Sequence, residues 1–439
     1  MRYKGTLVVI LVAAVVIGSS SVYCLNYVPP RRPAALFRLS ETIVVENRGN
    51  ESVEFGGLRT EAFLDFSWQE PRIVQVLDSQ GRKLFYVRRL DKDGNPYLII
   101  DGPPNLNPNE SYTATVLWEV KSFPRNISRS ISVGGSESPS QIPESLMNYT
   151  KQVAPWSSPP DLRLNTSLWK DESEYHNKTI LEVAEILREG REKVLEIVLE
   201  DVRWITSYIG YESASPTYPI ETARNRKGDC DDQSNLLIAL LRLQGIPSFL
   251  MMGQVYLEGY ANWTSTGMEG HLYYEAHHTA GHAWVMVYVP PWGWLPCDPV
   301  IPNGGGPLTA VTEAFAASPI TLVYQNLTGV HESSDYIESG REQTERAERE
   351  ETYFSLIQDM EQLPLPSDYV FLRLYPAVIL AVEVAGFGVA ITAVSAYEFR
   401  KAKLLPFPLR ETRCFYCGAG NPADAVYCGY CGRRIVYRE

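Results

Sequence analysis

The chain has 439 residues, 45% apolar and 21% charged, so it is long enough for two or three domains that each bury a core. Its net charge of −12 is unevenly spread, because residues 1–28 carry +2 and residues 400–439 carry +5, which leaves −19 for the middle. Such an acidic middle argues against nucleic acid as its partner. Seven cysteines are too few for a disulfide framework in a chain of this length.

The chain begins with an apolar segment. Residues 6–18 read TLVVILVAAVVIG, and the uncharged run continues to about 20 residues, which is enough to span a bilayer. Small serines follow the run, as they do in cleaved signal peptides. We therefore predict a transmembrane anchor or a signal sequence at residues 5–25.

Two features indicate an exterior middle. The positive flank after a second apolar segment, at residues 374–397, predicts a transmembrane helix at 370–399 with a cytoplasmic C-terminus. Eight N-x-S/T sequons lie in the middle of the chain and none elsewhere, which is typical of exported surface. Their asparagines are Asn50, Asn109, Asn126, Asn148, Asn165, Asn177, Asn262 and Asn326. The sequence thus predicts a plasma-membrane glycoprotein with two spans.

Between the apolar segments we expect three regions. Residues 35–125 alternate in polarity between turn signals, which predicts an exterior antiparallel β-sandwich. Residues 125–171 are rich in Ser, Pro and Asn and suggest a linker, and residues 178–209 have helical periodicity. Residues 332–368 are charged, with Glu342 and Arg346 at i,i+4 spacing, so we expect an acidic helical stalk there.

The most informative segment is GDCDDQSNLLIALLRLQGIP, at residues 228–247. Its leucines form one helical stripe, and Gly245 followed by Pro247 marks the end of the helix. With Asp229 as N-cap, Cys230 falls in the first turn, where free N–H groups and the helix dipole stabilise a thiolate. The neighbouring carboxylates oppose that effect. We expect a nearby imidazolium to prevail, so that Cys230 is alkylated near neutral pH.

The expected imidazole belongs to His282 in GHAWVMVYV, which predicts a strand at residues 281–289. A second strand of the same hairpin, WLPCDP, ends with Cys297 and Asp298. A carboxylate such as Asp298 is suited to fixing the tautomer of an imidazole. Because neighbouring strand residues point to opposite faces, Cys297 is not expected to be a second nucleophile.

These motifs resemble the transglutaminase-like domain of the papain-like thiol superfamily. The resemblance rests on R-x-G-D-C-D-D at 226–232, R-x-x-G-I-P at 242–247, G-H-A-W at 281–284 and D-P at 298–299. It implies an α+β thiol domain over residues 145–330, with the sandwich as a frequent companion. It also implies that Cys230 is the nucleophile, His282 the general base and acid, and Asp298 the residue that orients the histidine.

Three alternatives compete with this interpretation. Cys230 and Cys297 could form a disulfide in an oxidising exterior. Four histidines, His271, His277, His278 and His282, could suggest a metal site, although i,i+4 histidines share a face only on a helix. The exterior domain could also be a catalytically inactive ligand-binding module that signals through the second span.

The tail contains Cys414, Cys417, Cys428 and Cys431 in the pattern C-x2-C-x10-C-x2-C. Four thiolates in two such knuckles suit tetrahedral Zn²⁺, so we predict a structural zinc ribbon at residues 410–439 and no cofactor for catalysis. The tail resembles the short zinc ribbons that end many prokaryotic membrane proteins, which implies a prokaryotic origin, with archaea favoured. Its charge permits contact with a cytoplasmic protein partner, and nucleic acid is the less economical explanation.

Together these features predict a membrane-anchored exterior thiol enzyme that acts on amide bonds of a protein or peptide. The Cys–His–Asp set serves peptide hydrolysis and transglutaminase-type acyl transfer equally well, and the sequence leaves the choice between them open.

Overall fold

The computed structural model describes residues 31–125, 130–213, 215–259, 262–301, 306–330, 335–365, 411–422 and 425–435. Nearly all of them belong to one compact unit, Ala34–Leu363 with Thr412–Glu439. The other unit contains both apolar segments predicted to span the membrane, and these segments lie outside the described residues. Among the described residues, no helix is long and apolar enough to cross a bilayer.

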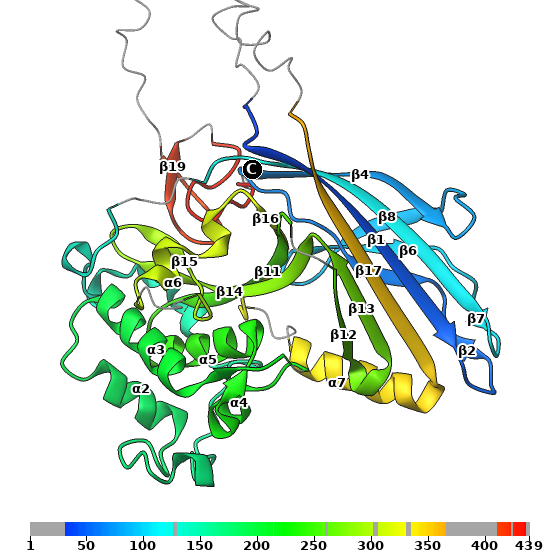
Figure 1. Cartoon of the computed structure of the whole chain (residues 1–439). Helices are drawn as coiled ribbons and strands as arrows, with labels where there is room; N and C mark the ends of the chain where they lie inside the picture. The colour runs from blue at the N-terminus through cyan, green and yellow to red at the C-terminus, as the bar shows by residue number, and fades with distance from the viewer. Residues whose placement is uncertain are drawn as a thin grey trace, which may run out of the picture. The chain divides into compact units, whose positions relative to one another are not determined.

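The β-sandwich is built on a six-stranded sheet with the order β12-β13-β17-β1-β8-β4 (Figure 1). A three-stranded sheet, β3-β6-β5, contributes to the same buried cluster, and β2 pairs with β7. Strict alternation along β1 and β8 turns Phe37, Leu39, Val116 and Trp118 into this core. The strands that precede the thiol domain in the chain are β1 (Ala35–Asn47), β2 (Val53–Glu54), β3 (Leu58–Glu61), β4 (Gln69–Asp78), β5 (Tyr86–Leu90), β6 (Pro96–Ile100), β7 (Asn105–Leu106) and β8 (Ser111–Ser122).

The expected helical stalk at 332–368 is wrong. Its first half is a helix, α7 (Tyr336–Glu350), but this helix is anchored to the thiol domain by hydrogen bonds and an ion pair. The helix ends at Glu351 in the left-handed conformation, and the chain continues as strand β17 (Thr352–Leu363). β17 pairs along its whole length with β1, so this segment belongs to the β-sandwich.

A second excursion ties the two domains together. Strands β12 (Trp263–Gly267) and β13 (Leu272–His277) lie in the chain between two strands of the thiol domain, yet they extend the sandwich sheet. β13 pairs in parallel with β17, and β12 pairs with β13 to form the edge of the sheet. Two strands that the chain places between β11 and β14 of the thiol domain therefore complete the sandwich sheet (Figure 1).

The thiol domain contains a four-stranded antiparallel sheet with the order β15-β14-β11-β16. Its strands are β11 (Ser248–Tyr256), β14 (Thr279–Val289), β15 (Gly293–Cys297) and β16 (Thr321–Leu327). The helices are α2 (Ile180–Arg188), α3 (Val194–Tyr208), α4 (Pro219–Asn225), α5 (Cys230–Leu243) and α6 (Thr309–Thr312), and β9 (Gly210–Tyr211) pairs with β10 (Lys227–Gly228).

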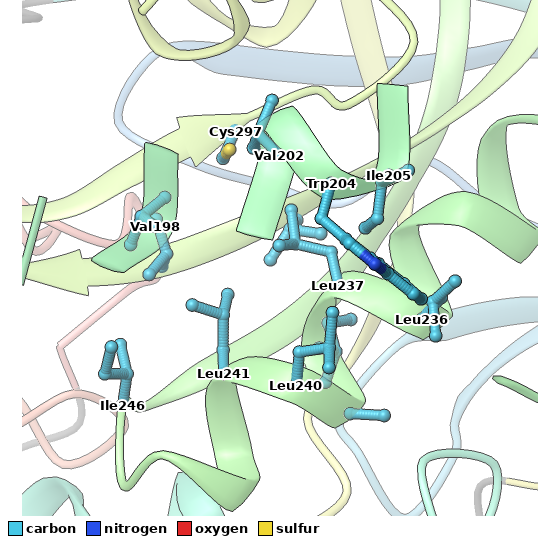
Figure 2. Close-up of a cluster of buried hydrophobic side chains, with 14 of the residues drawn as sticks. Val198, Val202, Trp204, Ile205, Leu236, Leu237, Leu240, Leu241, Ile246 and Cys297 are labelled. Atoms are coloured by element: carbon cyan, nitrogen blue, oxygen red, sulfur yellow. The ribbon is translucent and has the colours of Figure 1, made fainter. Parts of the chain in front are cut away.

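One face of this sheet packs on the helices. Figure 2 shows Leu237 and Leu241 of α5 beside Val198 and Val202 of α3 in the cluster that also contains Cys297 of β15. α5 ends as its sequence predicts, because Gly245 adopts φ +76° and the Ile246 N–H donates to the carbonyl of Leu241 at 2.8 Å.

Most of the Ser/Pro-rich segment at 125–171 is not a free linker. Residues 130–171 contain short 3-10 turns rather than long elements, but four of their apolar side chains are buried in the thiol-domain core, namely Ile131, Trp156, Leu164 and Trp169. Trp156 donates its indole N–H to Asn235 of α5 at 2.8 Å, and Trp169 donates to the carbonyl of Ala223 at 2.7 Å. This segment therefore stabilises the helical layer that contains α5.

The other face of the four-stranded sheet is also apolar. Phe249, Trp284 and Trp294 on this face share a buried cluster with the four tail cysteines, whose segment carries strands β18 (Glu411–Arg413) and β19 (Gly420–Pro422). Polar contacts join the same surfaces: Arg433 donates to the carbonyl of Asp93 at 3.1 Å, and the Ser67 N–H donates to the carbonyl of Gly432 at 3.0 Å. The tail segment thus covers apolar side chains that would otherwise face water.

Candidate functional site

Cys230 is the first residue of α5, and Asp229 is its N-cap as the sequence predicts. The backbone N–H of Asp229 donates to Asp232 Oδ2 at 3.3 Å, which holds the first turn. Glycine is needed just before the cap, because a Cβ at Gly228 would lie 2.6 Å from the Cβ of Asp232. The local sequence therefore fixes the cysteine at the positive end of a buried helix.

His282 and Asp298 form the pair that the sequence predicts. His282 lies on β14, and its Nε2 is 2.6 Å from Oδ2 of Asp298, which directly follows β15. Asp298 is fully buried, whereas the His282 side chain is 10% exposed. Because Nε2 is bonded to the carboxylate, Nδ1 is the ring nitrogen that remains for proton transfer. Phe315 stands edge-on to the imidazole, with ring centroids 5.4 Å apart.

Cys297 lies away from this pair. It is fully buried among the apolar residues between the sheet and α3 (Figure 2), while the next residue, Asp298, points to the histidine. Both Cys230 and Cys297 are free thiols, which excludes the proposed disulfide between them in this structure. Burial also raises the pKa of the Cys297 thiol far above its usual value.

The sulfur of Cys230 lies beside the histidine strand. The backbone N–H of Ala283, the residue after His282, donates to this sulfur and favours the thiolate. Within the described residues, Cys230 and His282 are not joined by a hydrogen bond. Such bonds are often long in enzymes without substrate and tighten when the substrate binds.

The electrostatics of Cys230 differ from the sequence prediction. Burial is the largest cause that raises the pKa of the thiol, and the charges of Asp231 and Asp229 raise it further. The ligand atoms of these three residues all lie within 4.8 Å of one another. The surroundings of the sulfur therefore favour a protonated thiol in the resting site, in contrast to the thiolate near neutral pH that the sequence predicts. The desolvation of the sulfur was not visible in the sequence.

Three tyrosines near the nucleophile escaped the sequence analysis. The Tyr336 hydroxyl of α7 donates to Asp231 Oδ2 at 2.7 Å and accepts from Asn235 Nδ2 at 2.6 Å, so α7 helps to position the first turn of α5. A charge on Cys230 raises the pKa of both Tyr211 and Tyr324, which places both phenols near the thiol. They come from distant segments, and no local pattern links them to the cysteine.

The four tail cysteines fit a tetrahedral metal ion. Their sulfurs all lie within 4.8 Å of one another, with Cys414 and Cys431 at 3.7 Å and Cys417 and Cys428 at 3.5 Å. Zinc–sulfur bonds of about 2.3 Å place tetrahedral sulfurs about 3.8 Å apart. Asn421 donates to the sulfur of Cys428 at 3.5 Å and accepts from the Gly429 N–H at 2.8 Å, which is a typical outer contact of such sites.

The histidines do not form a comparable group. His271 bonds the carbonyl of Thr352 at 2.9 Å, His277 pairs with Glu275, and His278 is an exposed partner of Asp359. In the part of the chain that the structure describes, no set of three metal-ligating side chains includes any of them. The alternative of a histidine metal site therefore has no support.

Comparison with known proteins bears on the segment that carries these residues. Residues 182–299 match the family described as the transglutaminase-like superfamily. The chain contains a transglutaminase-like domain. The matched segment begins in α2 and ends just after Asp298, so it includes the cysteine, the histidine and the aspartate.

Individual relatives are distant. The uncharacterized protein YebA of Bacillus subtilis (strain 168) is 28% identical over 115 residues, which cover 23% of this chain and 15% of that protein. A candidate cysteine protease from Cytophaga hutchinsonii has a TM-score of 0.44 at 13% identity, covering 76% of this chain and 92% of that one. The periplasmic domain of TgpA from Pseudomonas aeruginosa has a TM-score of 0.27 at 15% identity, covering 61% and 90%.

Proposed function

We propose that this protein is a membrane-anchored thiol enzyme that breaks amide bonds on the exterior of the cell with Cys230, His282 and Asp298. The observation that carries the proposal is the His282–Asp298 pair, which leaves Nδ1 of the imidazole available. Cys230 lies close by, because its sulfur accepts from the backbone N–H of Ala283, the residue after His282. A mixed α and β fold with a transglutaminase-like domain supports the same chemistry.

In the first half-reaction the sulfur of Cys230 attacks the carbonyl carbon of an amide. Because the resting thiol is protonated, its proton moves to Nδ1 of His282 as the carbon–sulfur bond forms. Asp298 stabilises the resulting imidazolium through its bond to Nε2. The imidazolium then returns the proton to the departing nitrogen, the carbon–nitrogen bond breaks, and an amine and a thioester remain.

In the second half-reaction water or an amine attacks the thioester. His282 accepts the proton of the attacking group and returns it to the sulfur when the carbon–sulfur bond breaks. Water gives a carboxylic acid, which is amide hydrolysis, and an amine gives a new amide, which is acyl transfer.

A second candidate is the inactive ligand-binding ectodomain. The raised pKa of Cys230, together with the absence of a hydrogen bond to His282 among the described residues, favours it. The two candidates differ in one observable quantity, the release of free amine from peptide amides. The test is to incubate the full-length chain with a peptide library and to count new amino termini and carboxylates by mass spectrometry. If the protein is an enzyme, the wild-type chain produces them and the Cys230→Ala chain does not. Equal products from both chains would support the inactive ligand-binding ectodomain instead.

The exterior location remains a proposal. Six sequon asparagines are exposed, Asn126 lies outside the described residues, and Asn326 is buried, where its backbone N–H bonds Asn95 at 2.8 Å. Glycosylation at Asn326 is therefore incompatible with the folded domain. The six exposed asparagines remain the proposed glycosylation sites. The apolar segments at 5–25 and 370–399 are the proposed membrane spans.

The tail is proposed to hold one structural Zn²⁺ through its four cysteines. Its packing on the thiol domain has a consequence for topology, because contacting residues must lie on the same side of a membrane. The basic flank after residue 397 instead predicts a cytoplasmic tail opposite an exterior thiol domain. The two arrangements exclude each other within one chain, and they predict opposite results for the accessibility of the tail.

A further inference from the structure

A cavity of about 220 Å³ lies where the β-sandwich meets the thiol domain. Gly281 of β14 lines it and directly precedes His282, so the cavity reaches to within one residue of the histidine. Tyr324 of β16 also lines it and is close enough to Cys230 to sense a charge on the sulfur. The cavity therefore lies near the candidate nucleophile, and residues of both domains line it.

Aromatic rings form much of its wall. Phe63 and Trp118 of the sandwich meet edge to face, with ring centroids 5.3 Å apart, and Phe63 also contacts Tyr324 at 6.4 Å. Trp263 and Tyr274, from the two strands that extend the sandwich sheet, meet in the same way at 5.0 Å. Aromatic side chains on several sides of a cavity favour a cation, because ring faces carry negative potential.

Two carboxylates line the same cavity. Glu41 of β1 is held in place by hydrogen bonds, because its Oε1 accepts from the Thr60 hydroxyl at 2.9 Å and its Oε2 accepts from Gln358 Nε2 at 2.8 Å. Gln358 is itself fixed by Tyr274, which donates to its Oε1 at 2.7 Å. Glu61 of β3 is exposed at the cavity and lies close enough to raise the pKa of Glu41.

Neither carboxylate has a cationic partner in the described part of the chain, where no Lys, Arg or His forms an ion pair with Glu41 or Glu61. The lining residues of the cavity include no Lys, Arg or His either. Burial raises the pKa of Glu41, so its charged form is destabilised unless a positive charge lies beside it. A positively charged group inside the cavity would relieve both the burial cost and the repulsion between the two carboxylates.

We propose that this cavity binds a protonated primary amine of the substrate, between the carboxylates of Glu41 and Glu61 and the aromatic wall. The inference rests on the proposed function, and it names the substrate class: amides whose acyl part carries an alkylammonium group, such as a lysine side chain. An alkylammonium group donates up to three hydrogen bonds and is small enough for a cavity of this volume.

The binding test uses the full-length chain in detergent with Cys230→Ala, so that no covalent step takes place. Pentylamine and the neutral 1-pentanol are titrated by calorimetry at neutral pH. We expect pentylamine to bind at least about tenfold more tightly than pentanol, since a hydrogen bond to a charged group is worth about that factor or more. Glu41→Gln should remove this preference, Glu61→Gln should reduce it, and Glu51→Gln, a matched change outside the cavity, should leave it unchanged.

A further arm, with Cys230 present, tests whether the cavity recognises an ammonium group of the amide substrate. Glu41→Gln should raise the KM for a lysine peptide but not for its norleucine counterpart.

Equal binding of pentylamine and pentanol would overturn the inference, and so would unchanged pentylamine binding in both Glu41→Gln and Glu61→Gln. Because Glu61 is exposed, its variant remains informative if Glu41→Gln proves unstable. The binding test needs no catalysis, so its failure leaves the proposed thiol chemistry standing. Conversely, if pentylamine binds but no acyl adduct ever forms on Cys230, the proposed function is refuted and the proposed ammonium site stands.

Discussion

Asp298 accepts a 2.6 Å hydrogen bond from Nε2 of His282 and is itself completely buried. Its backbone is fixed as well, because the Asp298 N–H donates to the carbonyl of Ala310 at 2.8 Å. The orientation of the imidazole is therefore set by a residue that solvent does not reach, and that the folded core holds in one position.

Replacing Asp298 by Asn should keep the fold and lower kcat by about 10²–10⁴-fold, since an amide cannot stabilise the imidazolium. The measurement is the initial rate of amide cleavage at saturating substrate, with thermal unfolding as the check on folding. Asp161→Asn, at an exposed carboxylate, is the matched control and should retain full activity. A normal kcat in the Asp298→Asn chain would show that the His282–Asp298 pair does not contribute to catalysis.

The midpoint pH of the Cys230 alkylation rate should lie above that of a free thiol, whose pKa is about 8.5. Burial and the charges of Asp231 and Asp229 raise the pKa of this thiol, so the reactive thiolate forms only as the pH rises. Asp231→Asn removes one negative charge and should shift the iodoacetamide rate profile to lower pH. Because Tyr336 donates to Asp231, Tyr336→Phe separates loss of that bond from loss of the charge. A wild-type midpoint below 8.5 would instead indicate a preformed ion pair with His282.

The candidate site residues could be picked out from the sequence because each lies in a short local pattern. Asp229 caps the helix that begins at Cys230, and the strand of His282 alternates in polarity. The raised pKa of Cys230 could not be predicted, since it depends on how much of the sulfur is covered by other segments. Local pattern determines which residues start a helix, whereas desolvation depends on the complete fold.

The strand at residues 352–363 could not be predicted from the sequence for a related reason. The i,i+4 charge pairs lie only in α7, so the sequence predicts a helix that continues where the structure has strand β17. β17 contains several polar residues, and it is recognised as a strand through its pairing with β1, more than 300 residues away in the chain. The apolar second face of β14, with Trp284 and Met286, was a visible sign that this face is covered, but the sequence does not identify the tail as its cover.

Removing the metal from the tail should destabilise the thiol domain. The four cysteines share a buried cluster with Trp284 and Trp294, so loss of the metal should expose these indoles. For the detergent-solubilised chain we expect one Zn²⁺ per chain, and a Tm that falls by about 2–4 °C for each kcal/mol lost on chelation. Tryptophan fluorescence should shift to the red in parallel. A Cys414→Ser chain should behave like the chelated wild type. An unchanged Tm and spectrum would mean that the tail neither holds zinc nor supports the domain.

The side of the membrane on which the tail lies can be measured with an epitope tag after residue 439. Antibody binding to intact and permeabilised cells is compared with that of a tag in the exposed turn at Gly81. The basic flank at residues 400–403 predicts that intact cells expose the middle tag and hide the terminal one. If both tags are accessible in intact cells, the docked tail of the structure is the arrangement in the membrane, and the segment at 370–399 does not separate the two domains.

The central claim is that the sulfur of Cys230 forms a thioester with an amide substrate. The most direct measurement is to incubate the full-length chain with peptide amides, quench it in acid and map acyl adducts by mass spectrometry. We expect an adduct on Cys230 that disappears with hydroxylamine, is nearly absent from His282→Ala, and does not form on the buried Cys297. Substrate turnover with no adduct on Cys230, or an adduct that forms equally well on Cys297 and in His282→Ala, would contradict the account.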